Sequence, residues 1–146
     1  EVGGASVLDA YSGSGALGFA ALSRGAGALL FVESDSDVAD LLESNGAKIG
    51  ASGRFRVMRA RMLDIASRPA PDGPFGIILA DPPYGSDEVA RLLPLITDPG
   101  WLLPGGVLVL EREKRDDPIG EAGNGFELTR TARYGRTCLD IYRCSR

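Results

Sequence analysis

Short apolar segments alternate with segments of helical periodicity through most of the chain, and this alternation restricts the possible folds more than any other feature. The predicted strands span residues 6–10, 28–33, 54–60, 75–80 and 106–111. Helices are expected after the first, second and fourth strands, because apolar residues there recur at the spacing of one helix face. Strands that alternate with helices predict a mostly parallel sheet with helices on both faces. The expected fold class is therefore a doubly wound α/β fold.

The C-terminal part of the chain has a different pattern. Residues 113–125 are polar, with Pro118 and three glycines, and predict a loop. Residues 126–134 and 137–143 then predict two strands joined by a turn at Gly135-Arg136. The parallel sheet is therefore expected to be followed by an antiparallel hairpin.

Capping residues predict where two of the helices begin. Ser34 with Asp37 is typical of a capping box, so a helix is expected to start there. Ser86 is expected to cap the helix after the fourth strand, and Pro94 is expected to kink or shorten it.

Composition excludes several kinds of site. The chain of 146 residues fits one domain, and it contains no histidine, which excludes Ser-His-Asp and Cys-His catalysis and a His-ligated zinc. No metal site is expected. Cys138 and Cys144 lie in one predicted strand, about 20 Å apart at about 3.3 Å per residue, so two free thiols are expected. The apolar segments are too short to cross a bilayer and no signal-peptide pattern opens the chain, so a cytoplasmic location is expected.

A glycine-rich turn follows the first predicted strand. Residues 13–18 (GSGALG) match the pattern G-x-G-x-x-G, in which glycines allow a ligand to approach the backbone closely. The simpler alternative is a tight turn in which Gly18 only allows a helix to pack against a strand. Glu33 ends the second strand, where a carboxylate can accept hydrogen bonds from both hydroxyls of a ribose. Up to this point NAD and S-adenosylmethionine fit equally well.

Asp9 separates these two cofactors. It lies just before the glycine turn, where a carboxylate would repel a pyrophosphate but would suit a ligand with a sulfonium and an amino group. S-adenosylmethionine is therefore favoured over NAD.

The motif Asp81-Pro82-Pro83-Tyr84 directly follows the fourth predicted strand. The carboxyl ends of parallel strands share one edge of a sheet, so this motif and the glycine turn are expected to face the same crevice. Two prolines remove two backbone donors and leave a rigid corner of acceptors, which suits an exocyclic amine of a nucleobase stacked on Tyr84. Asp81 and the Pro82 carbonyl would hold the amine with its lone pair directed at a methyl donor. An ordinary Pro-Pro turn is the alternative.

The segments VLDAYSGSGALGFAALSRGA, FVESD, ILADPPYG and RYGRTCLDIYR together resemble the RsmD-type methyltransferases, which use S-adenosylmethionine to methylate the N2 amine of a guanine in 16S ribosomal RNA. The resemblance implies a Rossmann-like class I methyltransferase fold and a partner that is 16S ribosomal RNA or the small ribosomal subunit. A monomer is also expected. The resemblance also implies that residues 81–84 hold the target base. The implied cofactor-binding residues are Asp9, Tyr11, Ser12, Gly13, Gly15, Gly18, Glu33, Ser34 and Met62.

Two departures from this family concern the adenine and the RNA. Relatives often carry an acid after the third strand, whereas this chain has Ala60-Arg61-Met62, so adenine recognition is expected to fall to the Met62 backbone and to apolar packing. Relatives also carry a basic RNA-binding segment ahead of the first strand, which this chain is expected to lack, in keeping with its net charge of −4. Most of the remaining basic candidates are expected to be solvated, and they are Arg54, Arg56, Arg59, Arg61, Arg130, Arg133 and Arg136.

Three other functions stay open at this point. Adenine N6 or a DNA base are substrates that the DPPY motif also allows. An NAD-dependent oxidoreductase fits the glycine turn and Glu33 but not Asp9 or the DPPY motif. A module that binds cofactor or RNA without catalysis is the third.

Overall fold

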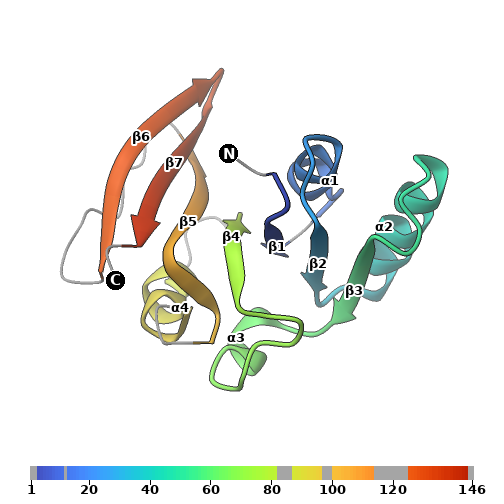
Figure 1. The fold of residues 1–146 in the computed structure, drawn as a ribbon, viewed down its shortest axis with the longest axis horizontal. Helices are drawn as coiled ribbons and strands as arrows, with labels where there is room; N and C mark the ends of the chain where they lie inside the picture. The colour runs from blue at the N-terminus through green and yellow to red at the C-terminus, as the bar shows by residue number, and fades with distance from the viewer. Residues whose placement is uncertain (1–2, 12, 82–86, 97–99, 114–124, 145–146) are drawn as a thin grey trace.

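The computed structural model describes residues 3–11, 13–81, 87–96, 100–113 and 125–144. Its described strands form one sheet in the order β3-β2-β1-β4-β5-β7-β6 (Figure 1). The strands are β1 Ser6–Ala10, β2 Ala28–Glu33, β3 Phe55–Arg59, β4 Phe75–Ala80, β5 Leu102–Glu113, β6 Phe126–Tyr134 and β7 Thr137–Cys144. The helices are α1 Ala16–Ser23, α2 Ser36–Lys48, α3 Met62–Ile65 and α4 Glu88–Ile96.

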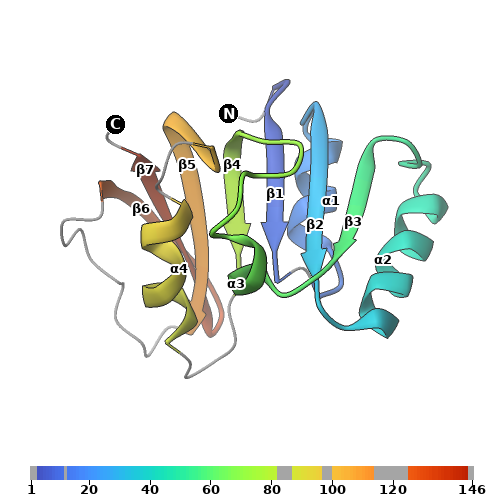
Figure 2. The same cartoon turned by 90° about the horizontal axis from the view of Figure 1, so that it is seen from below.

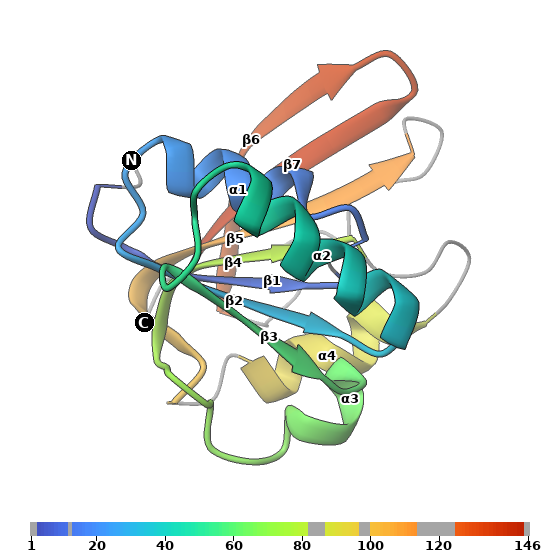
Figure 3. The same cartoon turned by 90° about the vertical axis from the view of Figure 1, so that its right-hand side faces the viewer.

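Strands β1 to β5 run parallel, and among the described strands only β7 runs in the opposite direction. β7 pairs antiparallel with β5, and β6 pairs antiparallel with β7. Figure 2 shows the arrowheads of the parallel strands at one common edge of the sheet. Helices α1 and α2 cover one face of the sheet, and α3 and α4 cover the other (Figure 3). The predicted doubly wound sheet with a C-terminal antiparallel hairpin is confirmed.

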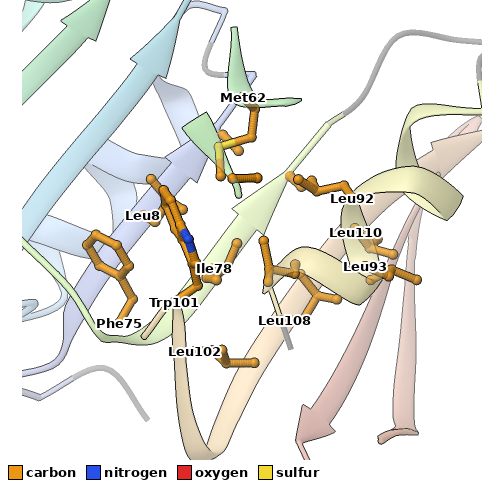
Figure 4. Close-up of a cluster of buried hydrophobic side chains, with 14 of the residues drawn as sticks. Leu8, Met62, Phe75, Ile78, Leu92, Leu93, Trp101, Leu102, Leu108 and Leu110 are labelled. Atoms are coloured by element: carbon orange, nitrogen blue, oxygen red, sulfur yellow. The ribbon is translucent and has the colours of Figure 1, made fainter. Parts of the chain in front are cut away.

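The larger apolar core lies between the sheet and helices α3 and α4. Leu8, Ile78 and Leu108 come from three neighbouring strands, and Leu92 of α4 and Trp101 pack into the same cluster (Figure 4). The Trp101 Nε1 group donates a hydrogen bond to a backbone carbonyl at 2.8 Å, so its polar atom is satisfied. This core anchors the centre of the sheet.

A second core lies under α1 and α2. Because side chains alternate along a strand, Val7 points to this face while its neighbour in β1 points to the other. Phe19, Phe31 and Phe55 pack edge to face here, with ring centroids 4.9 to 5.9 Å apart, and Leu42 of α2 packs against the same cluster. This packing fixes helix α1, and with it the glycine turn that precedes α1.

Several element boundaries differ from the sequence prediction, since β3 covers Phe55–Arg59 rather than 54–60 and β7 ends at Cys144 rather than at 143. Strand β5 runs over Leu102–Glu113 rather than 106–111, because pairing with β4 begins at Leu102 and pairing with β7 continues to Glu113. The predicted cap at Ser34 is wrong by one residue, since the Asp35 side chain accepts the N–H groups of Asp37 and Val38 at 2.9 and 3.2 Å. The Asp35 carboxylate thus accepts two backbone N–H groups of the first helical turn, which have no partner within the helix.

The other expectations have mixed outcomes. Helix α4 is present and contains Pro94 near its end, whereas its expected cap Ser86 lies outside the described residues. Most of the expected loop at 113–125 also lies outside them.

Cys138 and Cys144 are buried free thiols, as predicted. Within the part of the chain that the structure describes, no helix is long and apolar enough to cross a membrane.

Candidate functional site

Strand register brings the two sequence motifs together at the carboxyl edge of the sheet. Ala10 of β1 pairs with Ala80 of β4, so the next residues, Tyr11 and Asp81, leave the sheet side by side. Ala80 also pairs with Leu110 of β5, which places Asp81 beside Glu111. The predicted proximity of the glycine turn and Asp81 is therefore confirmed.

Two hollows lie along this edge and share Tyr11. The first, here called the glycine-turn hollow, is lined by Asp9, Tyr11, Gly13, Ser14, Ala16, Leu17, Asp81 and Glu111. The second, here called the β2–α3 hollow, is lined by Tyr11, Val32, Glu33, Ser34, Ala60, Arg61, Met62, Leu63 and Glu88. The two hollows together contact most of the predicted cofactor-binding residues. The predicted residues Ser12, Pro82, Pro83 and Tyr84 lie outside the described part of the chain.

The glycines of the turn have different structural roles. Gly13 has φ of 54° and would have open space around a Cβ atom, so its backbone borders the glycine-turn hollow. Gly15 has φ of 83° and comes just before α1, in the left-handed region that favours glycine. A Cβ atom at Gly18 would lie 2.6 Å from the Phe31 ring, so Gly18 allows α1 to pack closely on the sheet. Direct contact of Gly15 and Gly18 with a cofactor stays a prediction.

Asp9 connects β1 to the glycine turn. Its side chain is 4% exposed, and Oδ2 accepts a hydrogen bond from the Gly18 N–H at 3.1 Å. Burial raises the pKa of the Asp9 carboxyl well above its usual value, the Gly18 hydrogen bond opposes this shift, and the nearby Asp81, Glu33 and Glu111 carboxyls add to it. Asp9 therefore holds helix α1 against β1, and a cation in the glycine-turn hollow would favour its charged form.

Glu33 is held in one orientation by backbone donors. Its Oε1 atom accepts the Gly13 N–H at 3.2 Å, and its Oε2 atom accepts the Asp35 N–H at 3.0 Å. Each carboxylate oxygen can accept more than one hydrogen bond, so both keep acceptor capacity toward the β2–α3 hollow. Glu33 thus links the end of β2 to the glycine turn and presents acceptors to a ligand.

Tyr11 lies where the two hollows meet. Its backbone has φ of 61°, a conformation that is uncommon for a residue with a side chain. Burial raises the pKa of the Tyr11 hydroxyl above its usual value of 10.0, and the nearby Glu88 raises it further. The hydroxyl therefore stays neutral at physiological pH.

Asp81 and Glu111 form a pair of carboxyl groups in the glycine-turn hollow. Asp81 has an exposed surface, yet burial of its carboxyl group raises its pKa to about 7, and a hydrogen bond to Glu111 and the charge of Glu111 add to the shift. Two adjacent carboxylates repel each other, so Asp81 is partly protonated near neutral pH. An acid whose pKa lies near the working pH is typical of sites that transfer or bind protons.

Several of the predicted basic candidates are already engaged. Arg56 pairs with Asp72 at 2.5 Å, and Arg59 pairs with Asp40 at 2.6 Å. Arg54 donates a long hydrogen bond of 3.4 Å to a backbone carbonyl of α1. The three hairpin arginines are exposed, and no ion pair joins them to another described residue.

The residues that sequence reasoning missed come from neighbouring elements. Glu111, Glu88, Ala60 and Leu63 all line the hollows. The sequence does contain a feature that points to Glu111, because it is an acid near the end of a predicted strand, as Glu33 is. Its position beside Asp81 depends on the register of β4 and β5, which shifts at a bulge between Phe75 and Ile77.

Comparisons with known proteins agree with this geometry. The family model described as "Conserved hypothetical protein 95" matches residues 1–143. Ribosomal RNA small subunit methyltransferase D of Haemophilus influenzae is 34% identical over 113 residues, which cover 77% of this chain and 58% of that protein. "Putative rRNA methyltransferase YlbH" of Bacillus subtilis is 34% identical over 139 residues, which cover 93% of this chain and 74% of that protein.

Solved structures are similar over almost the whole chain. "Putative methyltransferase yhhF" from Escherichia coli superposes with a TM-score of 0.83 at 29% identity, covering 98% of this chain and 77% of that chain. The chain spans little more than half the length of the first relative, 58% of it. Because the family model matches nearly all of the sequence and the sheet has the same architecture, the chain belongs to the conserved hypothetical protein 95 family, the family of RsmD-type methyltransferases.

Proposed function

We propose that this chain transfers a methyl group from S-adenosylmethionine to the exocyclic N2 amine of a guanine in 16S ribosomal RNA. The observation that carries the proposal is the glycine-turn hollow, in which Asp81 and the glycine turn lie on one surface. A relative named ribosomal RNA small subunit methyltransferase D supports the choice of RNA.

The residues of the two hollows fit S-adenosylmethionine. Glu33 would bind the ribose hydroxyls, because its oriented oxygens keep free acceptor capacity. Val32, Met62 and Leu63 would pack against the adenine in the β2–α3 hollow. The carboxyl groups around the glycine-turn hollow suit a ligand with positive charge and disfavour the pyrophosphate of NAD. When bound, S-adenosylmethionine supplies a methyl group that its sulfonium activates.

Asp81 would position the target amine. The lone pair of an aryl amine is delocalised into the ring, so the amine is a poor nucleophile until its geometry changes. An N–H donated to Asp81, with a second N–H donated to the Pro82 carbonyl, would direct the lone pair at the methyl carbon. As the new N–C bond forms, the S–C bond breaks and the amine becomes positively charged. A carboxylate of the Asp81–Glu111 pair can then accept the proton that the product loses.

A direct test incubates the protein and methyl-labelled S-adenosylmethionine with unmodified small-subunit RNA, and identifies the modified nucleoside by mass spectrometry. N2-methylguanine is the expected product. N6-methyladenine, or methylation of a DNA oligonucleotide in preference to RNA, would assign a different substrate. Binding of NAD in place of S-adenosylmethionine in calorimetry would contradict the proposal itself.

Methyl transfer is expected to decline as the pH falls through about 7, because the pKa of Asp81 is raised to about 7 and the protonated acid is a poorer acceptor. Glu111→Gln removes the neighbouring negative charge, so the carboxylate form of Asp81 becomes more favourable. The acid limb of the pH profile should then move down by about one pH unit. The measurement is kcat/KM for S-adenosylmethionine against pH for both proteins. An unchanged acid limb in Glu111→Gln would show that the pair does not control the profile.

Glu33→Ala is expected to weaken S-adenosylmethionine binding by about 10- to 100-fold, the range for loss of hydrogen bonds to a charged group. Isothermal titration calorimetry measures the affinity directly. Glu43→Ala is the matched control, because Glu43 is an exposed glutamate on α2. Equal affinities of the two variants for S-adenosylmethionine would show that Glu33 does not bind the ribose.

A further inference from the structure

We propose that the tip of the β6–β7 hairpin, residues 130–136, is an RNA-binding surface that holds backbone phosphates beside the target nucleotide. This inference rests on the proposed function, since it assigns the position of the RNA substrate. The surface is here called the hairpin tip. Its partner is a looped or single-stranded RNA segment that carries the target guanine.

The hairpin tip is basic in an acidic chain. Residues 130–136 (RTARYGR) contain three arginines and no acid, whereas the whole chain has a net charge of −4. Arg130, Arg133 and Arg136 are exposed, and Tyr134 is 64% exposed. Guanidinium groups bind phosphate in a bidentate way, and an exposed aromatic ring offers a surface on which a base can stack. This composition is typical of a surface that binds RNA.

Strand register places the hairpin tip at the same edge as the two hollows. Thr137 pairs with Glu113, the last residue of β5, so the turn between β6 and β7 lies at the carboxyl end of β5. Figure 2 shows this turn at the edge where the arrowheads of the parallel strands end. From β4 the order continues through β5 and β7 to β6, so the tip lies roughly 10–15 Å to the side of Asp81 at about 5 Å per strand. If Asp81 holds the target base, phosphates close to that nucleotide would lie at about this distance from Asp81.

The charges of the two regions are complementary to different parts of an RNA strand. The carboxylates of Glu33 and Glu111 line the hollows, and negative charge there repels phosphates but admits an uncharged base. The arginines of the hairpin tip attract the phosphates that the hollows repel. The strand would therefore lie with its backbone toward the tip and its target base turned toward Asp81.

Arg24, Arg54, Arg56 and Arg59 do not offer the same surface, and Arg61 lines the β2–α3 hollow itself. Arg56 and Arg59 are paired with aspartates. Arg54 directly precedes β3, and Arg24 follows α1 next to Gly25, whose carbonyl accepts the Gly4 N–H ahead of β1. Arg24 and Arg54 therefore lie at the amino edge of the sheet, away from the hollows. They provide a matched control for charge reversal.

The test compares Arg133→Glu/Arg136→Glu with Arg24→Glu/Arg54→Glu, which changes the net charge equally. Affinity for a labelled stem-loop of unmodified small-subunit RNA is measured by fluorescence anisotropy at several salt concentrations. The hairpin variant is expected to bind at least about tenfold more weakly, with a salt slope smaller by about 1.4 for two lost phosphate contacts. The control variant should bind within about twofold of the unmodified protein. Arg133→Lys/Arg136→Lys, which keeps the charge, should recover most of the affinity.

Two further readouts separate this inference from the proposed function. S-adenosylmethionine affinity and the melting temperature should be the same in the hairpin variant and the unmodified protein. If the hairpin variant binds RNA as tightly as the control variant does, the inference is overturned even when the unmodified protein methylates RNA. If the hairpin variant alone loses RNA affinity but the unmodified protein transfers no methyl group, the surface stands and the proposed reaction fails.

Discussion

Replacing Asp81 by alanine is expected to reduce the rate of methyl transfer by about 10²- to 10³-fold, the range seen when one group that positions or stabilises the reacting atoms is removed. The physical reason is that the amine would lose the acceptor that aligns its lone pair with the methyl carbon. S-adenosylmethionine affinity should change by less than about threefold, because Glu33 and the β2–α3 hollow are untouched. Single-turnover methyl transfer to small-subunit RNA and calorimetry with S-adenosylmethionine provide the two measurements.

Two variants make this result specific. Asp81→Asn keeps an amide oxygen as acceptor and should retain more activity than Asp81→Ala. Asp64→Ala removes an exposed carboxylate from α3 and should leave the rate unchanged. A rate for Asp81→Ala within twofold of the unmodified protein would mean that the amine is positioned by other groups.

The strands could be predicted because each is an apolar segment of a length typical of a buried strand. Residues 28–33 are an example, since four consecutive residues of β2 are buried and only its ends are more exposed. The rule that crossovers are right-handed then limits the topology to a few arrangements, and the observed order is one of them. The expected location of the ligand at the carboxyl edge followed from this topology.

The limits of β5 could not be predicted in the same way. Pro104 and Gly105 are exposed and break the apolar pattern, so nothing in the local sequence marks them as part of a strand. They belong to β5 because residues on both sides of them pair with β4. Strand ends depend on partners that are distant in sequence, and composition does not reveal those partners.

The glycine turn combines the two interpretations that its sequence left open. Gly13 borders open space at the site, which fits a ligand close to the backbone. Gly18 packs against Phe31 and donates its N–H to Asp9, which fits the simpler interpretation of a close contact between helix and strand. The motif pattern alone could not divide these roles, because the division depends on how α1 sits on the sheet.

Electrostatic coupling among the carboxyl groups was also hidden from the sequence. Asp9, Asp81 and Glu111 belong to three different strands or strand ends, far apart along the chain. Only the pairing of β1, β4 and β5 brings them into one hollow. The sequence predicts a carboxylate near the sulfonium only at Asp9, whereas the hollow also contains Asp81 and Glu111.

Arg112→Ala is expected to destabilise the protein by about 3–5 kcal/mol, because it leaves a buried carboxylate without its cation. Asp140 on β7 is 1% exposed, and the Arg112 guanidinium on β5 binds it with two hydrogen bonds of 2.5 and 3.2 Å. The hydrogen bond to Asp140 raises the pKa of Arg112, so the guanidinium is charged at all working pH values. Thr131 on β6 donates a further hydrogen bond of 2.7 Å to Asp140. One carboxylate thus connects three strands and attaches the hairpin to the parallel sheet.

Urea unfolding of Arg112→Ala and Arg56→Ala would test this account, because Arg56 makes an exposed ion pair whose loss should cost less than about 1 kcal/mol. Arg112→Met/Asp140→Leu should be more stable than Arg112→Ala, since it removes the buried charge together with its partner. Equal stability of Arg112→Ala and Arg56→Ala would show that Asp140 finds other partners. The expected order would mean that a buried ion pair fixes the hairpin, with its proposed RNA-binding tip, to the sheet. Partial loss of that pair should then weaken RNA binding more than it weakens S-adenosylmethionine binding.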